Sequence, residues 1–155
     1  MNPFKTLRLK TQCGLFILSA LLSWHSLAGE LNMDSTQEFD NYLVHYSVFN
    51  SAFIPADIAK LHNLVRAKDQ ALVNISVQDK HSGESIAAQV EGTARNLMQQ
   101  QKTLTFVTLQ EPGASYAIAA LRHSNEEVFH FDISIKPLHS KTPLTIKFTR
   151  KLYTE

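Results

Sequence analysis

The chain has 155 residues, of which 44% are hydrophobic, and 15 basic residues against 14 acidic ones give it a formal net charge of +1. This balanced charge lacks the basic excess that binding to a nucleic-acid backbone requires, so we expect no nucleic-acid partner. The single cysteine, Cys13, excludes an internal disulfide framework.

The first 28 residues have the three-part pattern of a signal peptide. An apolar run over residues 13–22 follows three basic residues, Lys5, Arg8 and Lys10. The small residues Ser26 and Ala28 then predict cleavage before Gly29. A retained membrane anchor is the alternative, but the apolar run is about half of the ~20 residues that a spanning helix needs. Cys13 opens the run instead of following it, so we reject a lipid anchor.

Cleavage would change both the charge and the chemistry of the chain. The mature chain from Gly29 keeps 12 basic residues against 14 acidic ones, a formal charge of −2. It also loses its cysteine, and with it any disulfide, thiolate metal site or cysteine nucleophile. We therefore expect an exported protein without a membrane span, whose core of about 130 residues folds without disulfides.

The mature chain is predicted to begin with a flexible lead-in followed by a strand. Residues 29–37 are largely polar and show no clear period, so we assign them to the lead-in. Residues 39–49 alternate between apolar and polar side chains, which predicts a strand with one buried face. The apolar face of this strand carries Tyr42, Val44, Tyr46 and Val48.

The next segment does not alternate, and it contains the signals of a short helix. Pro55 can open a helix, and Asp57 would lie in its first turn, where the helix dipole favours a carboxylate. Ile58 and Leu61 are three residues apart and would share a face. We predict a helix over residues 55–63 that packs over an end of the fold.

The alternating pattern returns after this helix. Residues 71–78 and 86–92 both alternate, and the polar turn between them predicts a hairpin. Residues 97–102 are expected to form a crossing connection. Residues 103–110 are rich in β-branched and aromatic side chains but alternate imperfectly, which favours a bulge or an edge strand. Pro112 and Gly113 then suit the central positions of a type II turn, and residues 115–122 form a further strand.

The clearest strand covers residues 128–136, with an apolar face of Phe129, Phe131, Ile133 and Ile135. The last strand carries Leu144, Ile146, Phe148 and Leu152. If the two strands pair antiparallel, opposed residues share a face, so odd residues of the first must oppose even residues of the second. Among these registers we favour the one that places Ile133 opposite Ile146, because it also pairs Asp132 with Lys147.

Strands joined mostly by short turns, with one short helix, lack the helical crossovers that a parallel sheet requires. We therefore predict an all-β fold: an antiparallel sandwich of the immunoglobulin or fibronectin III type, with about seven strands and one short helix. It would form a single domain over residues 38–155. A closed barrel is the alternative.

Four segments resemble one protein family: VHYSVFNSAF (44–53), LVRAK (64–68), LVNISV (72–77) and NEE (125–127). They are similar to the family called domain of unknown function 4426, and the resemblance covers essentially the whole mature chain. The family consists of small exported proteins of Gram-negative bacteria. The resemblance therefore implies an immunoglobulin-like β-sandwich in the periplasm, and it implies no particular activity.

The residues that could carry chemistry do not form a recognisable site. Six histidines remain after cleavage, but they show neither a His-x-His pair nor a His/Met cluster, so we predict no metal site and no cofactor. His45 and Ser47 share a strand face, yet no Gly-x-Ser-x-Gly motif or orienting acid accompanies them. Glu126 and Glu127 are consecutive and should point apart. We predict no catalytic residues.

Five residues in irregular segments beside strands are the candidate interaction residues: Asn50, Ser51, Arg66, Asn125 and Glu126. Loops on a rigid scaffold are where recognition usually occurs. The structural alternative is that the asparagines cap or turn the backbone, and that Arg66 pairs with an acid such as Asp69. We expect a periplasmic, non-catalytic module that binds an envelope protein or a small ligand. Metal or small-molecule handling by the histidines is an alternative, and a hydrolase is a weaker one.

Overall fold

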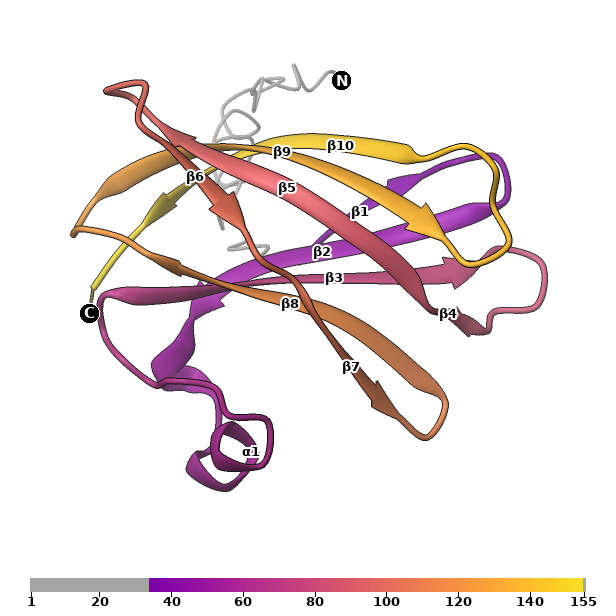
Figure 1. The fold of residues 1–155 in the computed structure, drawn as a ribbon, viewed down its shortest axis with the longest axis horizontal. Helices are drawn as coiled ribbons and strands as arrows, with labels where there is room; N and C mark the ends of the chain where they lie inside the picture. The colour runs from indigo at the N-terminus through magenta and orange to yellow at the C-terminus, as the bar shows by residue number, and fades with distance from the viewer. Residues whose placement is uncertain (1–33, 155) are drawn as a thin grey trace, which may run out of the picture. The chain divides into compact units, whose positions relative to one another are not determined.

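The computed structural model of the protein describes residues 34–154, which form two antiparallel β-sheets (Figure 1). The expected signal peptide and its cut before Gly29 lie outside the described residues. One sheet has six strands in the order β1-β2-β3-β8-β7, with β4 beside β3, and the other has four in the order β10-β9-β5-β6. The predicted all-β antiparallel sandwich is confirmed, and it is not one closed barrel.

Ten strands and two short helical segments occur in the described residues. The strands are β1 (Asp34–Glu38), β2 (Tyr42–Asn50), β3 (Gln70–Asp79), β4 (Ser85–Ile86), β5 (Ala88–Asn96), β6 (Gln101–Leu104), β7 (Val107–Glu111), β8 (Ala114–Arg122), β9 (Glu127–Pro137) and β10 (Leu144–Leu152). The helical segments are η1 (Ser51–Phe53) and α1 (Ala56–Leu61). The number of strands exceeds the prediction because β1 takes in residues 34–37 of the expected lead-in, β4 is added, and one predicted strand divides into β6 and β7.

The pairing of β9 with β10 confirms the register predicted from the sequence. Ile133 lies opposite Ile146 and Asp132 opposite Lys147, with 2.7 Å between Lys147 Nζ and Asp132 Oδ2. The apolar face of β9 is buried at no more than 2% exposure, and Phe131 stacks on Phe148 with ring centroids 4.7 Å apart. The alternation of apolar side chains therefore sets which face enters the core, as the sequence pattern indicated.

Strand β5 lies in the four-stranded sheet, so the hairpin predicted between residues 71–78 and 86–92 is wrong. Only Ser85 and Ile86 of β4 pair with β3, and β5 then runs between β9 and β6 in the other sheet. Gly92 explains the close fit, because a Cβ there would lie 3.0 Å from both the Asp132 carbonyl oxygen and Ile133 Cγ1. This contact between distant segments is not encoded in the local alternation.

The segment expected to be a crossing connection is a tight turn followed by β6. Asn96 closes this turn, since its side-chain oxygen accepts a hydrogen bond from the Gln100 N–H at 2.9 Å. After Leu104 the chain passes to the six-stranded sheet, where β7 is an edge strand. This confirms the edge strand that was one of the two predictions for residues 103–110. Gly113 has φ +79°, the value that a type II turn needs at this position.

Residues 51–69 connect β2 to β3, and we call this segment the crossover. The predicted helix is present as α1, with Pro55 at its N-cap and Asp57 in its first turn. It does not pack over the end of the sandwich through Ile58 and Leu61; only Ala59 is buried. Three polar residues, Asn50, Ser51 and Gln70, are buried at this end of the fold. No helix of the described residues is long and apolar enough to cross a bilayer.

Candidate functional site

Three of the candidate residues hold the two legs of the crossover together. The Asn50 side chain is buried; its Nδ2 donates to the Lys68 carbonyl at 2.7 Å, and its Oδ1 accepts from the Ala52 N–H at 2.9 Å. Ser51 Oγ both donates to and accepts from the backbone of Ala67. These bonds fix the crossover to the ends of β2 and β3.

Arg66 continues the same set of bonds one residue further along each leg. Its Nη2 donates to the Ala52 carbonyl at 2.9 Å, while Asp69 pairs with Arg122 at 2.6 Å. Arg66 and Asp69 therefore have separate partners and do not form the pair suggested as the structural alternative. The next residues along the two legs, Phe53 and Val65, are both exposed.

The other two candidates lie in the turn between β8 and β9. Asn125 Oδ1 accepts from the Thr154 N–H at 3.1 Å. Glu126 has φ +58° and pairs with Lys151, and this hydrogen bond lowers the pKa of Glu126 and raises that of Lys151. Because Asn50 Nδ2 also reaches the Tyr153 carbonyl at 3.4 Å, both groups of candidates meet around residues 153–154.

Glu127 has partners different from those of Glu126, as expected for consecutive residues. Burial acts to raise the pKa of the Glu127 carboxyl. Hydrogen bonds from the Asn96 side chain at 2.9 Å and from the Ser124 N–H at 2.7 Å outweigh this effect, and the net pKa lies below its ordinary value. The two carboxylates stabilise a turn and do not form an acid/base pair.

The histidines of the described residues are His45, His62, His81, His123, His130 and His139. His45 Nδ1 lies 3.0 Å from Thr36 Oγ1 and its Nε2 lies 3.5 Å from Gln78 Oε1, so Ser47 is not its partner. Within residues 34–154, no three or more His, Cys, Asp or Glu side chains gather closely enough to hold a metal ion.

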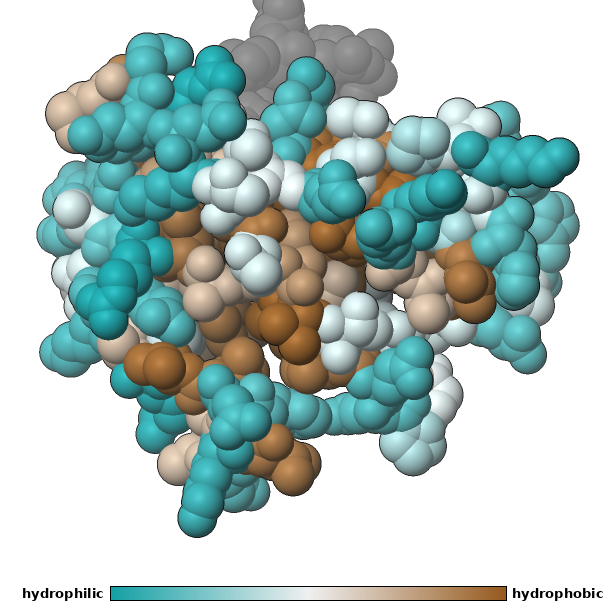
Figure 2. Space-filling model, in the orientation of Figure 1, coloured by the Kyte–Doolittle hydropathy of each residue, from teal (hydrophilic) through white to brown (hydrophobic). Residues whose placement is uncertain are grey.

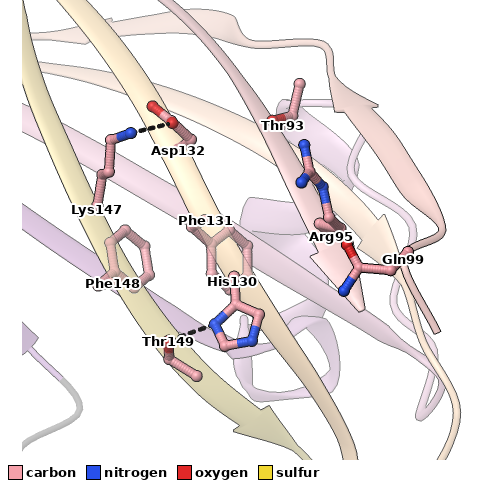
Figure 3. A pocket seen from close by; sticks show the side chains of 9 residues that line it. All are labelled: Thr93, Arg95, Gln99, His130, Phe131, Asp132, Lys147, Phe148 and Thr149. Atoms are coloured by element: carbon pink, nitrogen blue, oxygen red, sulfur yellow. Dashed lines mark hydrogen bonds and ion pairs between the residues drawn. The ribbon is translucent and has the colours of Figure 1, made fainter. Parts of the chain in front are cut away.

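A shallow groove of about 470 Å³ lies on the outer face of the four-stranded sheet (Figure 3). It is lined by Thr93, Arg95, Gln99, His130, Phe131, Asp132, Lys147, Phe148 and Thr149. His130 Nδ1 lies 2.8 Å from Thr149 Oγ1, the spacing of a base and a hydroxyl nucleophile. The acid of the groove, Asp132, is paired with Lys147 and not with His130, so the orienting acid of a triad is missing from this arrangement. The polar side chains of the groove can form hydrogen bonds with a polar molecule or surface.

The crossover carries four large apolar side chains that are exposed, although the sequence pattern predicts that two of them, Ile58 and Leu61, pack against the fold. Phe53 is 65% exposed, Ile58 41%, Leu61 71% and Val65 57%. We call these four residues the apolar tip. In Figure 2, brown hydrophobic side chains interrupt the teal surface over α1, at the lower left of the view. The spacing of Ile58 and Leu61 was the available signal, but the pattern could not indicate that their shared face has no partner.

The comparisons with known proteins agree on the family and on the fold. The model of the DUF4426 family, described as a domain of unknown function, matches residues 36–155. A crystal structure of a DUF4426 family protein from Pseudomonas aeruginosa PAO1 is 30% identical, with a TM-score of 0.71 over 79% of this chain and 97% of that one. No curated protein matches the chain.

Two structures of FetP from uropathogenic Escherichia coli strain F11 are similar in fold. One, of protein produced recombinantly in the periplasm, has 11% identity and a TM-score of 0.58, covering 77% of this chain and 93% of that one. The other, a copper-bound variant, has 11% identity and a TM-score of 0.56, covering 77% and 95%. At this identity the likeness is one of fold alone.

Proposed function

The chain belongs to the DUF4426 family, and since that family carries no assigned function, we propose one from the molecule itself. The protein is an exported, non-catalytic module that binds a component of the cell envelope through the crossover. In this proposal residues 1–28 are a signal peptide, Gly29 begins the mature periplasmic chain, and the binding domain extends beyond the predicted residues 38–155 to include all of β1. The tripartite N-terminal pattern supports the export.

The observation that carries the proposal is the exposure of the apolar tip on a firmly attached segment. Clusters of large apolar side chains on a protein surface commonly mark interaction sites, because water disfavours them. A freely moving loop would lose much of its binding free energy when it became ordered. The hydrogen bonds of Asn50, Ser51 and Arg66 reduce that loss, because they hold the crossover before any partner arrives. Asn50 and Ser51 are buried, so they support the binding surface and are not themselves its contacts, whereas Arg66 is exposed beside the apolar tip.

Photo-crosslinking in living cells tests the proposal. A photoreactive residue replaces Leu61 of the apolar tip in one variant and Thr145, exposed on the opposite sheet, in the control variant. Irradiation should give a defined adduct from position 61 and none of comparable yield from position 145. Equal yields from both positions, or no adduct from position 61, would overturn the proposal.

Metal handling by histidines remains the second candidate, and copper-bound FetP is the observation that favours it. Titration of the mature protein with Cu(II), followed by thermal melts with and without a chelator, separates the two candidates. The binding-module proposal expects melts that superimpose. A chelator-induced fall of several degrees, roughly 1 kcal/mol for a domain of this size, would favour metal handling instead.

A further inference from the structure

We infer that the component bound by the crossover is an anionic phospholipid surface, into which the apolar tip inserts. The inference rests on the proposed function, because it uses the same binding surface and names what that surface binds. The protein would then be attached peripherally to a bilayer through residues 51–69.

The apolar tip has the arrangement that insertion into a bilayer surface needs. The buried Ala59 turns one side of α1 toward the protein, while Ile58 and Leu61, three residues apart, share another side that is exposed. The hydrogen bonds of Ser51 and Arg66 join the two legs of the crossover, and these legs carry the exposed Phe53 and Val65. Figure 1 shows α1 extending away from the strands of the two sheets.

The charge of the crossover matches anionic headgroups. Its cations are Lys60, Arg66 and Lys68, all exposed, and we call them the crossover cations. Its acids are Asp57 and Asp69, and Asp69 is already paired with Arg122 of β8. The mature chain as a whole is negative at −2, so this segment is locally positive on a negative protein. Basic residues beside an apolar face are typical of helices that lie at the interface of anionic membranes.

The size of the surface favours lipid over a protein partner. A stable protein–protein interface commonly engages about 20–30 residues on each side and buries ~800 Å² per partner. The crossover offers four exposed large apolar side chains on a projecting segment of 19 residues. A bilayer surface requires no shaped partner, and it can accept a few apolar side chains together with adjacent cations.

Vesicle sedimentation with the mature protein tests this inference. The probes are vesicles of phosphatidylethanolamine with phosphatidylglycerol and, for comparison, vesicles of neutral phosphatidylcholine. Binding should be confined to the anionic vesicles and should weaken as salt is added. Leu61→Ser should reduce the partition coefficient about tenfold, and Lys60→Gln about fivefold, as expected for the loss of one inserted side chain or one cation.

The chain offers a matched control for the loss of an exposed leucine. Leu97 in the turn between β5 and β6 is 65% exposed, close to the 71% of Leu61. Leu97→Ser should bind anionic vesicles like the wild type, and both serine variants should melt at the wild-type temperature because neither side chain is in the core. The mature wild-type chain has no tryptophan, so Leu61→Trp introduces a single one. The tryptophan emission of this variant should shift to shorter wavelength on binding to vesicles.

The outcomes separate this inference from the proposed function. Absence of binding to anionic vesicles, or equal losses from Leu61→Ser and Leu97→Ser, would overturn the inference. If vesicles do not bind but a photoreactive residue at position 61 captures one protein in cells, the inference fails and the proposed function stands. If neither lipid nor protein is captured, both fail.

Discussion

Replacing Asn50 with aspartate should destabilise the fold strongly at neutral pH and less strongly in acid. The Asn50 side chain is 8% exposed; it donates to the Lys68 carbonyl, donates through a longer bond to the Tyr153 carbonyl, and accepts from the Ala52 N–H. In Asn50→Asp the acceptor bond to the Ala52 N–H can persist. The other carboxylate oxygen, however, would face the Lys68 carbonyl at about the present 2.7 Å, with no proton between two acceptors.

The magnitude follows from these two contacts. Loss of the donor bond costs about 1 kcal/mol, and leaving buried acceptors unpaired adds ~1–3 kcal/mol, so the free energy of unfolding should fall by about 3 kcal/mol near neutral pH. Asn50→Ala removes the side-chain hydrogen bonds without adding a charge and should cost about 2 kcal/mol. Protonation of the introduced carboxyl would restore a donor toward Lys68. Its folded-state pKa is therefore raised, and the deficit relative to the wild type shrinks as pH falls through that pKa.

Urea denaturation of the wild type and both variants, at about pH 7.5 and about pH 5, measures these effects as shifts of the midpoint at constant m-value. The Asn50→Ala deficit should be the same at both pH values, which makes this variant the control for the charge. An Asn50→Asp variant within about 0.5 kcal/mol of the wild type at neutral pH, or with a deficit independent of pH, would refute this account of the crossover.

Three further predictions concern the sheets and the turns. Gly92→Ala should lower the free energy of unfolding by about 1–2 kcal/mol. The strain of overpacking against Ile133 exceeds the ~0.4–1 kcal/mol gained because alanine restricts the unfolded chain. A melting temperature at or above that of the wild type would contradict this. The pKa of Glu127 is lowered in the folded state, so its contribution to stability is present above the ordinary value of 4.5 and is lost as pH falls below it. In urea titrations, the free energy of unfolding of Glu127→Gln should therefore fall less steeply with decreasing pH than that of the wild type. An unchanged pH dependence would contradict this role of Glu127. A double-mutant cycle of Asp132 and Lys147 should give less than about 1 kcal/mol, because both side chains are more than half exposed; a coupling of ~2 kcal/mol would show that this pair does more than choose a register.

The final hairpin could be predicted from sequence because its information is local. Alternation along β9 and β10 determines which residues face the core, and one opposite-charge pair chooses among the remaining registers. The same reasoning failed at β5. Its place beside β9 depends on the absence of a side chain at Gly92, and this absence matters only when the fold has brought Ile133 next to Gly92. Alternation identifies a strand and its buried face, but it does not identify the neighbouring strand.

The candidate residues show a similar limit. The position of Asn50 and Arg66 beside strand ends indicated that their polar groups have a role, and both do bond the backbone. The meeting of Asn50 with Asn125 around residues 153–154 depends on the three-dimensional fold. The exposure of Leu61 was missed for the same reason, since a helical pattern shows that apolar side chains share a face but not whether a neighbour covers it.

The bonds at this end of the sandwich also determine when the chain can finish folding. Asn50 and Tyr153 are separated by 103 residues, and Arg150 donates to Ser35 across 115. Contacts between such distant segments form late, because the intervening chain must first lose much of its conformational freedom. Strands β2 and β3 can pair early, but β1 and β10 can be joined only after nearly the whole domain has been synthesised. For the export that we propose, the expected consequence is that the newly made chain stays open to translocation until its last strand has crossed the membrane.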